Sequence, residues 1–244
     1  MLMSVIEPEL ASSVYGELAG ARVLITGLTA SGGVDVARAF AEHKARLIVQ
    51  TPDLSPDLVE LTAHLSEVAC EVRLFDEPID NQEAAIRLAQ KSATAFGGFD
   101  VVINFITASK APVSGDYDDL ADYISQTLLP ATLVTRVAAN RMRLMHTEGS
   151  ILNVVSMAPP ADRRQAGVAT MVRATLSDLT RREAQAWADA GVRVNAIGPR
   201  SADGMGYCLA SEPEIAALAL YLASRKGRQL SGQVFDAENA SLHC

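Results

Sequence analysis

The sequence has little positive charge. Only 21 Lys and Arg residues stand against 29 Asp and Glu residues, which gives a formal net charge of -8 at pH 7. Nucleic-acid backbones and anionic membrane surfaces bind proteins through basic patches, which this composition does not readily supply. We therefore expect neither a nucleic acid nor a membrane as a partner.

Cysteine is also scarce. The chain has three cysteines, Cys70, Cys208 and Cys244, an odd number at wide spacing that favours reduced thiols over a disulfide framework. His243 beside Cys244 supplies too few ligands for a closed metal site, so no metal is expected. The first residues do not resemble a secretory signal, and no apolar run approaches the ~20 residues of a membrane span. The sequence predicts a soluble, cytoplasmic protein.

What the sequence does contain is a regular alternation of elements. Hydrophobic residues make up 49% of 244 residues, enough for one core, and we expect a single domain over residues 1–244. Short runs rich in Val, Ile and Leu alternate with longer stretches of helical periodicity, which predicts a doubly wound parallel α/β sheet of Rossmann type with helices on both faces. Its ligand crevice is expected at the carboxyl ends of the strands. The predicted strands are 21–26, 46–50, 71–75, 101–104, 150–155, 192–196 and 233–236, and the predicted helices are 33–42, 56–65, 81–95, 117–145, 167–190 and 212–224.

A glycine-rich turn follows the first predicted strand, within VLITGLTASGGVDVARAF. Backbone N–H groups at the start of the next helix would face a pyrophosphate, although tight strand–helix packing alone also accounts for the glycines. Here the chain resembles the short-chain dehydrogenase/reductase family, whose fingerprint is Thr-Gly, three residues, Gly, one residue, Gly. Thr26, Gly27 and Gly33 match, whereas Ser31 stands at the position of the middle glycine. A side chain there hinders the close approach of a dinucleotide to the backbone. The resemblance thus implies impaired dinucleotide binding.

Two further positions belong to the cofactor by the same resemblance. Asp76 stands where the family places an adenine-contacting aspartate, although a solvated loop aspartate fits the sequence equally well. Asn104 keeps the first residue of the family's Asn-Asn-Ala-Gly segment, which continues here with the bulky Phe105 and Ile106. The uncharged Thr51 at the end of the second strand assigns no preference between NAD and NADP. We expect weak or no binding of NAD(P).

The family's catalytic positions are altered as well. In the family a serine polarises the substrate oxygen, a tyrosine transfers the proton, and a lysine four residues later lowers the tyrosine pKa. The stretch ILNVVSMAPP resembles the family's serine strand and makes Ser156 the serine equivalent, while Ala169 falls at the tyrosine position and Arg173 at the lysine position. Loss of a positioned general acid costs roughly 10²–10⁴ in rate. The resemblance implies a vestigial site, with Tyr207 as the nearest alternative proton donor.

Two more departures agree with a lost active site. Gln126 or Thr127 stands where the family carries a catalytic asparagine. After VRVNAIGP, the family continues with a glycine and a lid of roughly twenty residues, whereas this chain has Arg200 and a short segment before the next helix. Little remains to exclude water from a reaction.

In this chain, the regions that correspond to the family's association surfaces are closely similar to those of the family. They are the last segment, EPEIAALALYLASRKGRQLSGQVF, and the two long predicted helices. With its association surfaces retained and its active site lost, the chain resembles the non-catalytic subunits of heteromeric family members, among them a subunit of a hydroxyacyl-CoA dehydrogenase. The leading hypothesis is a degenerate subunit that supports an active NAD(P)-dependent homologue, with self-association as the alternative assembly.

Two other functions stay open at the level of the sequence. One is an active NAD(P)-dependent alcohol dehydrogenase or carbonyl reductase with an atypical proton donor. The other is a ligand-binding sensor that uses Arg173 near the crevice.

Overall fold

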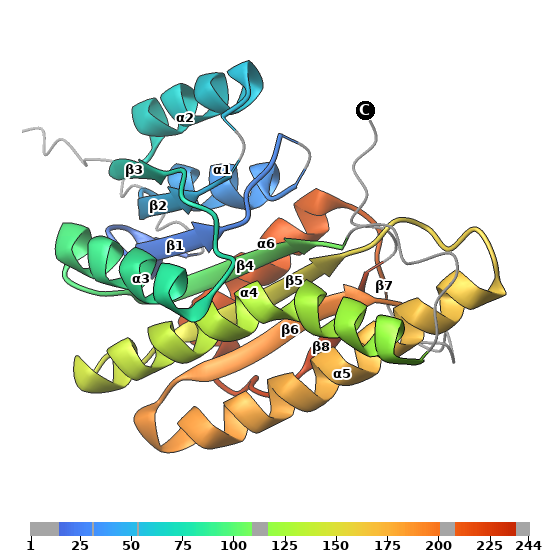
Figure 1. Ribbon diagram of the computed structural model, residues 1–244. Coiled ribbons are helices and arrows are strands. Elements are labelled where there is room, and N and C mark those ends of the chain that lie inside the picture. Colours follow the sequence, from blue (N-terminus) through green and yellow to red (C-terminus); the bar gives the residue numbers. More distant parts are fainter. Residues whose placement is uncertain (1–14, 31, 53, 109–116, 201–207, 238–244) are drawn as a thin grey trace, which may run out of the picture.

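The computed structural model describes residues 15–30, 32–52, 54–108, 117–200 and 208–237 (Figure 1). They form one eight-stranded sheet in the order β3-β2-β1-β4-β5-β6-β8-β7, with all neighbouring strands parallel. This confirms the predicted doubly wound parallel sheet. The strands are β1 (Arg22–Thr26), β2 (Arg46–Gln50), β3 (Glu71–Phe75), β4 (Val101–Thr107), β5 (Ser150–Ser156), β6 (Arg193–Pro199), β7 (Cys208–Leu209) and β8 (Val234–Ala237).

Helices cover both faces of the sheet (Figure 1). The helices α1, α2 and α6 pack on one face, and α3, α4 and α5 pack on the other. Among the described residues, no helix combines the length and apolar character needed to cross a bilayer. The helices are α1 (Val34–Glu42), α2 (Pro56–Val68), α3 (Gln82–Phe96), α4 (Tyr117–Leu144), α5 (Arg163–Trp187) and α6 (Glu212–Ala223), with short 3₁₀ turns η1 (Gly16–Leu18), η2 (Ala188–Ala190) and η3 (Arg225–Gly227).

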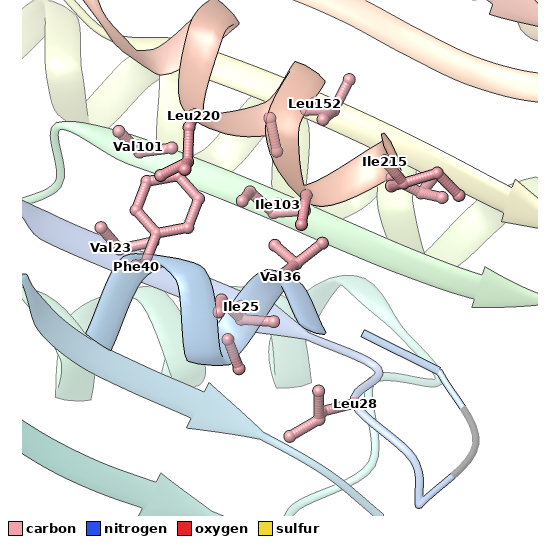
Figure 2. Close-up of a cluster of buried hydrophobic side chains, with 14 of the residues drawn as sticks. Val23, Ile25, Leu28, Val36, Phe40, Val101, Ile103, Leu152, Ile215 and Leu220 are labelled. Carbon is pink, nitrogen blue, oxygen red and sulfur yellow. The ribbon is translucent and has the colours of Figure 1, made fainter. Parts of the chain in front are cut away.

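The core forms because the central strands are apolar on both sides. In β1, Val23 and Ile25 belong to the cluster under α1 and α6, whereas Leu24 between them belongs to the cluster under α3 and α4. This is the period of two that a strand imposes. Figure 2 shows Phe40 of α1 and Leu220 of α6 among the side chains over β1 and β4. A sheet buried on both faces explains the continuous Val, Ile and Leu runs.

Three differences between the predicted and the observed elements have a clear physical cause. β4 runs to Thr107 rather than 104 and pairs in register with β5 over its whole length, so Phe105 belongs to the sheet. α5 begins at Arg163 rather than 167, because the Asp162 side chain accepts a hydrogen bond of 2.8 Å from the Gln165 amide and caps the helix. β7 was not predicted, since two residues are too few to show a strand period.

Candidate functional site

A cleft of about 400 Å³ opens at the carboxyl ends of β1 and β4, where the strand order reverses. This is the place at which open α/β sheets bind ligands, and it matches the predicted crevice. Its walls are the turn after β1, the loop between β3 and α3, the end of β4 and the first half of α4. The lining residues are Thr26, Gly27, Gln50, Pro52, 78–80, 104–107, Tyr123, Gln126, Thr127, Pro130 and Ala131.

Two of the predicted cofactor residues form a buried polar network under this cleft. Thr26 Oγ1 donates to Asn104 Oδ1 at 2.8 Å, and Asn104 Nδ2 donates to Asn153 Oδ1 at 2.8 Å. Thr135 Oγ1 of α4 donates to the same Asn153 oxygen at 3.1 Å. All four side chains are buried, so their polar atoms need these partners. The network joins β1, β4, β5 and α4 and gives the cleft a rigid floor.

The first amide of the glycine-rich turn is bound to a side chain of this protein. Gly27 N donates to Gln50 Oε1 at 2.8 Å, and Gln50 Nε2 donates to the Glu77 carbonyl oxygen at 2.9 Å. Gln50 is only 2% exposed, so its carboxamide is held in this position. Gly27 has φ +70°, and a Cβ there would lie 2.1 Å from the carbonyl oxygen of Phe105. The end of β4 therefore presses directly on the turn.

The N-terminus of α1 is also covered. An added Cβ at Gly33, which has φ +89°, would lie 2.8 Å from a ring carbon of Phe105 and 2.8 Å from Leu28 Cδ1. The Asp35 amide donates to Glu212 Oε1 of α6 at 3.0 Å. A helix N-terminus attracts anions through its free amides and its dipole. Here the carboxyl group of Glu212 takes that place, and a diphosphate on the same amide would have to displace it.

The environment of Glu212 makes its contribution to stability dependent on pH. Burial raises the pKa of Glu212 above its ordinary 4.5, the charge of Asp35 also raises it, and hydrogen bonds from the Asp35 and Gly33 backbones lower it by less. A raised carboxyl pKa opposes folding above the folded-state pKa, and this penalty fades as the pH falls toward the unfolded value. We expect Glu212→Gln to raise the free energy of unfolding at pH 7, and the gain to shrink by pH 5, in urea titrations.

Glu214 provides the matched control. It lies in the same first turn of α6, but its side chain accepts from the Ala210 amide at 2.6 Å instead of reaching α1. Glu214→Gln should not reproduce the pH-dependent gain. A lower stability of Glu212→Gln at pH 7 would contradict the expected sign.

The three residues predicted to stand at the family's catalytic positions do not line the cleft. Arg173 of α5 is held by β6 and β8: its Nη2 lies 2.5 Å from Asp236 Oδ1, and its Nη1 donates to the Pro199 carbonyl oxygen at 2.9 Å. The side chains of this ion pair are 17% and 15% exposed. Ala169, one turn earlier, is half-buried, and Ser156 ends β5. The charge of Arg173 is neutralised within the fold.

Other predicted residues contribute less to the site. Ser31 and Tyr207 lie outside the described residues. Asp76 is exposed after β3 and is not among the residues that line the cleft. Arg200 is exposed after β6.

Tyr123 is a cleft residue to which the sequence analysis assigned no role. Burial raises the pKa of Tyr123, and a hydrogen bond with Thr127 lowers it by less. Because the pKa of Tyr123 lies above its ordinary value of 10, the phenol stays protonated at neutral pH. A signal was present in the sequence, because Tyr123, Gln126, Thr127 and Pro130 are spaced to share one helix face.

Comparisons with known proteins point to one family. A family model described as enoyl-(acyl carrier protein) reductase matches residues 27–207. Borneol dehydrogenase of Lavandula x intermedia is 27% identical over 246 residues, covering 91% of each chain. Galactitol 2-dehydrogenase of Agrobacterium fabrum is 25% identical over 185 residues, covering 74% of this chain and 70% of its own length. A short-chain type dehydrogenase/reductase from Mycobacterium marinum superposes with a TM-score of 0.72 at 20% identity, covering 90% of this chain and 94% of its own.

Proposed function

The chain belongs to the short-chain dehydrogenase/reductase family of oxidoreductases, and from this premise we propose that it is a catalytically degenerate subunit that assembles with an active NAD(P)-dependent family member. One observation carries the proposal: the glycine-rich turn is filled by the protein's own groups. Gln50, Phe105 and Glu212 occupy it from β2, β4 and α6. The role of such a subunit is to stabilise and shape its partner.

The turn does not fit a nicotinamide dinucleotide. A pyrophosphate needs backbone amides, and two of those at the turn are hydrogen-bonded to Gln50 and Glu212. Of the described residues that line the cleft, none is Lys, Arg or His, and Asp80 adds a carboxylate. Phosphate groups would meet no compensating positive side chain there. Hydride transfer is therefore assigned to the partner subunit.

The altered catalytic positions support the same proposal. Ala169, at the family's tyrosine position, has no proton to donate. Arg173, at the lysine position, is a guanidinium that does not deprotonate, and it is bound to Asp236 instead of supporting a tyrosine. A positioned serine such as Ser156 is not sufficient for acid–base catalysis without its proton donor.

Exposed apolar side chains on three helices support assembly. Leu129 and Leu144 of α4 are 42% and 56% exposed, Met171 of α5 is 38% exposed and Tyr221 of α6 is 36% exposed. These helices are the ones that the family resemblance assigns to subunit contacts. Apolar surface on long helices is stabilised by burial in an interface.

The alternative is an active alcohol dehydrogenase or carbonyl reductase. The curated relatives named above are dehydrogenases, and Tyr123 supplies a hydroxyl group within the cleft. The degenerate subunit and the active enzyme are distinguished by substitutions of the candidate catalytic residues. If the chain is an enzyme of this kind, Ser156→Ala or Tyr123→Phe abolishes its turnover.

Turnover and partner capture test the proposal directly. We expect the purified chain to show no NAD(P)H oxidation with a panel of aldehydes and ketones, and no saturable NAD(P)(H) binding by calorimetry, because the turn is filled. From its native host, the tagged chain should co-purify with an intact family member in equal amount. Robust turnover by the chain alone, measured beside an active family member as a positive control, would sink the proposal.

A further inference from the structure

A second concave surface lies away from the cleft, between the last half of α5 and the turn that leads into β8. This α5–β8 groove has a volume of about 580 Å³ and shares no lining residue with the cleft. Ser177, Arg181 and Gln185 line it from α5 at a spacing of four, which places them on one helix face. Ser231 and Gln233 line it from the opposite wall.

The two walls of the groove meet at its base. Gly232, in the opposite wall, has φ +77°, and a Cβ there would lie 3.5 Å from Ala184 Cβ and 3.9 Å from Arg181 Cα. Its amide donates to the Val194 carbonyl oxygen at 2.7 Å, which ties the turn to β6. The two walls are therefore fixed relative to each other.

Three side chains that line this groove from α5 can donate hydrogen bonds and have none in the described structure. Among the described parts of the chain, Ser177, Arg181 and Gln185 make no hydrogen bond or ion pair. Ser231 Oγ accepts from the Val194 amide at 3.3 Å, which leaves its hydroxyl proton for another acceptor. No Asp or Glu of the described residues lines the groove.

The neighbouring arginines differ from Arg181. Arg173 closes one end of the groove with its charge bound to Asp236. Arg182 follows directly in the sequence but pairs with Asp178 at 2.7 Å on the helix surface. Arg181 thus supplies the uncompensated positive charge of the groove, in a protein whose net charge is -8.

We propose that the α5–β8 groove binds a small phosphate ester. Arg181 pairs with the phosphoryl oxygens, and Ser177, Gln185 and Ser231 donate to the oxygens that remain. A tetrahedral phosphate accepts hydrogen bonds from several directions, which suits donors on two facing walls better than a planar carboxylate does. The volume lies within the range of small-molecule sites and leaves room for the organic part of the ester.

Calorimetric titration of the full chain with glycerol 3-phosphate tests this site, with acetate at equal ionic strength as the comparison anion. We expect saturable one-site binding of the phosphate ester and none of acetate. Arg181→Gln should weaken binding about tenfold or more, and Ser177→Ala by roughly threefold to tenfold. Arg182→Gln is the matched control and should change the affinity by less than about twofold.

Thermal unfolding of each variant establishes that it is folded. No saturable binding by the wild-type chain would overturn the proposal. Equal affinity of the wild type and Arg181→Gln, or acetate binding as tight as that of the phosphate ester, would also overturn it. Because the groove and the cleft share no residue, this outcome is independent of NAD(P) binding.

Discussion

Replacing Gly27 by alanine is expected to lower the free energy of unfolding by about 3 kcal/mol or more. The residue has φ +70°, which a side chain disfavours, and the new Cβ would lie 2.1 Å from the Phe105 carbonyl oxygen. That oxygen belongs to Phe105 of β4, whose pairing with β5 continues to Thr107, so the backbone cannot move away without disturbing this pairing. The measurement is urea unfolding of both proteins without any nucleotide.

Two other glycines separate the causes of this loss. Gly20 has φ +75°, but nothing lies within 4 Å of its added Cβ, so Gly20→Ala carries only the backbone strain of about 1–2 kcal/mol. Gly167 lies within α5 with no atom within 4 Å, and Gly167→Ala should stabilise by about 0.5–1 kcal/mol. If Gly27→Ala cost no more than Gly20→Ala, contact with Phe105 would not be what requires the glycine.

If Gly27→Ala lowers stability more than Gly20→Ala does, the contact with Phe105 accounts for a glycine at position 27 without any bound cofactor. In the proposed subunit, the glycine is needed for the approach of β4 to the turn. A dinucleotide-binding glycine would be expected to act on ligand affinity as well as on stability.

Replacing Arg173 by methionine is expected to lower the free energy of unfolding by about 3 kcal/mol. The substitution removes the ion pair of Arg173 with Asp236, in which both side chains are largely buried, and the hydrogen bond from Arg173 to the Pro199 carbonyl oxygen. Urea unfolding measures the change. Arg182→Met, which breaks an exposed pair with Asp178, should change stability by no more than about 0.5 kcal/mol.

A double-mutant cycle distinguishes the pair from either residue alone. Combining Arg173→Met with Asp236→Asn should lower the free energy of unfolding by less than the sum of the single losses, by about 1 kcal/mol or more, because both single variants remove the same ion pair. Additive losses would show that Arg173 acts through packing instead of the ion pair. Coupling between these residues would support a structural role for Arg173, the residue predicted to stand at the family's lysine position.

Much of the fold was predictable because it depends on local patterns. The strands at residues 46–50 and 71–75 were predicted with their observed ends. The first is buried between helices and therefore forms a continuous apolar run. The ends of β4 and α5 were less predictable. The end of β4 at Thr107 depends on pairing with β5, and the start of α5 at Arg163 depends on the capping contact by Asp162.

Some features of the candidate site could likewise be read from the sequence, and others required the tertiary structure. The position of the glycine-rich turn after β1 is a property of residue order, so the sequence alone determined it, and the prediction that Ala169 stands at the family's tyrosine position also rests on the sequence alone. The contacts that fill the turn come from Gln50, Phe105 and Glu212, which lie far apart along the chain and meet only when β2, β4 and α6 surround α1. The same holds for Arg173: its charge was readable, but its pairing with Asp236 exists because β8 lies beside β6, and only the tertiary structure decided that.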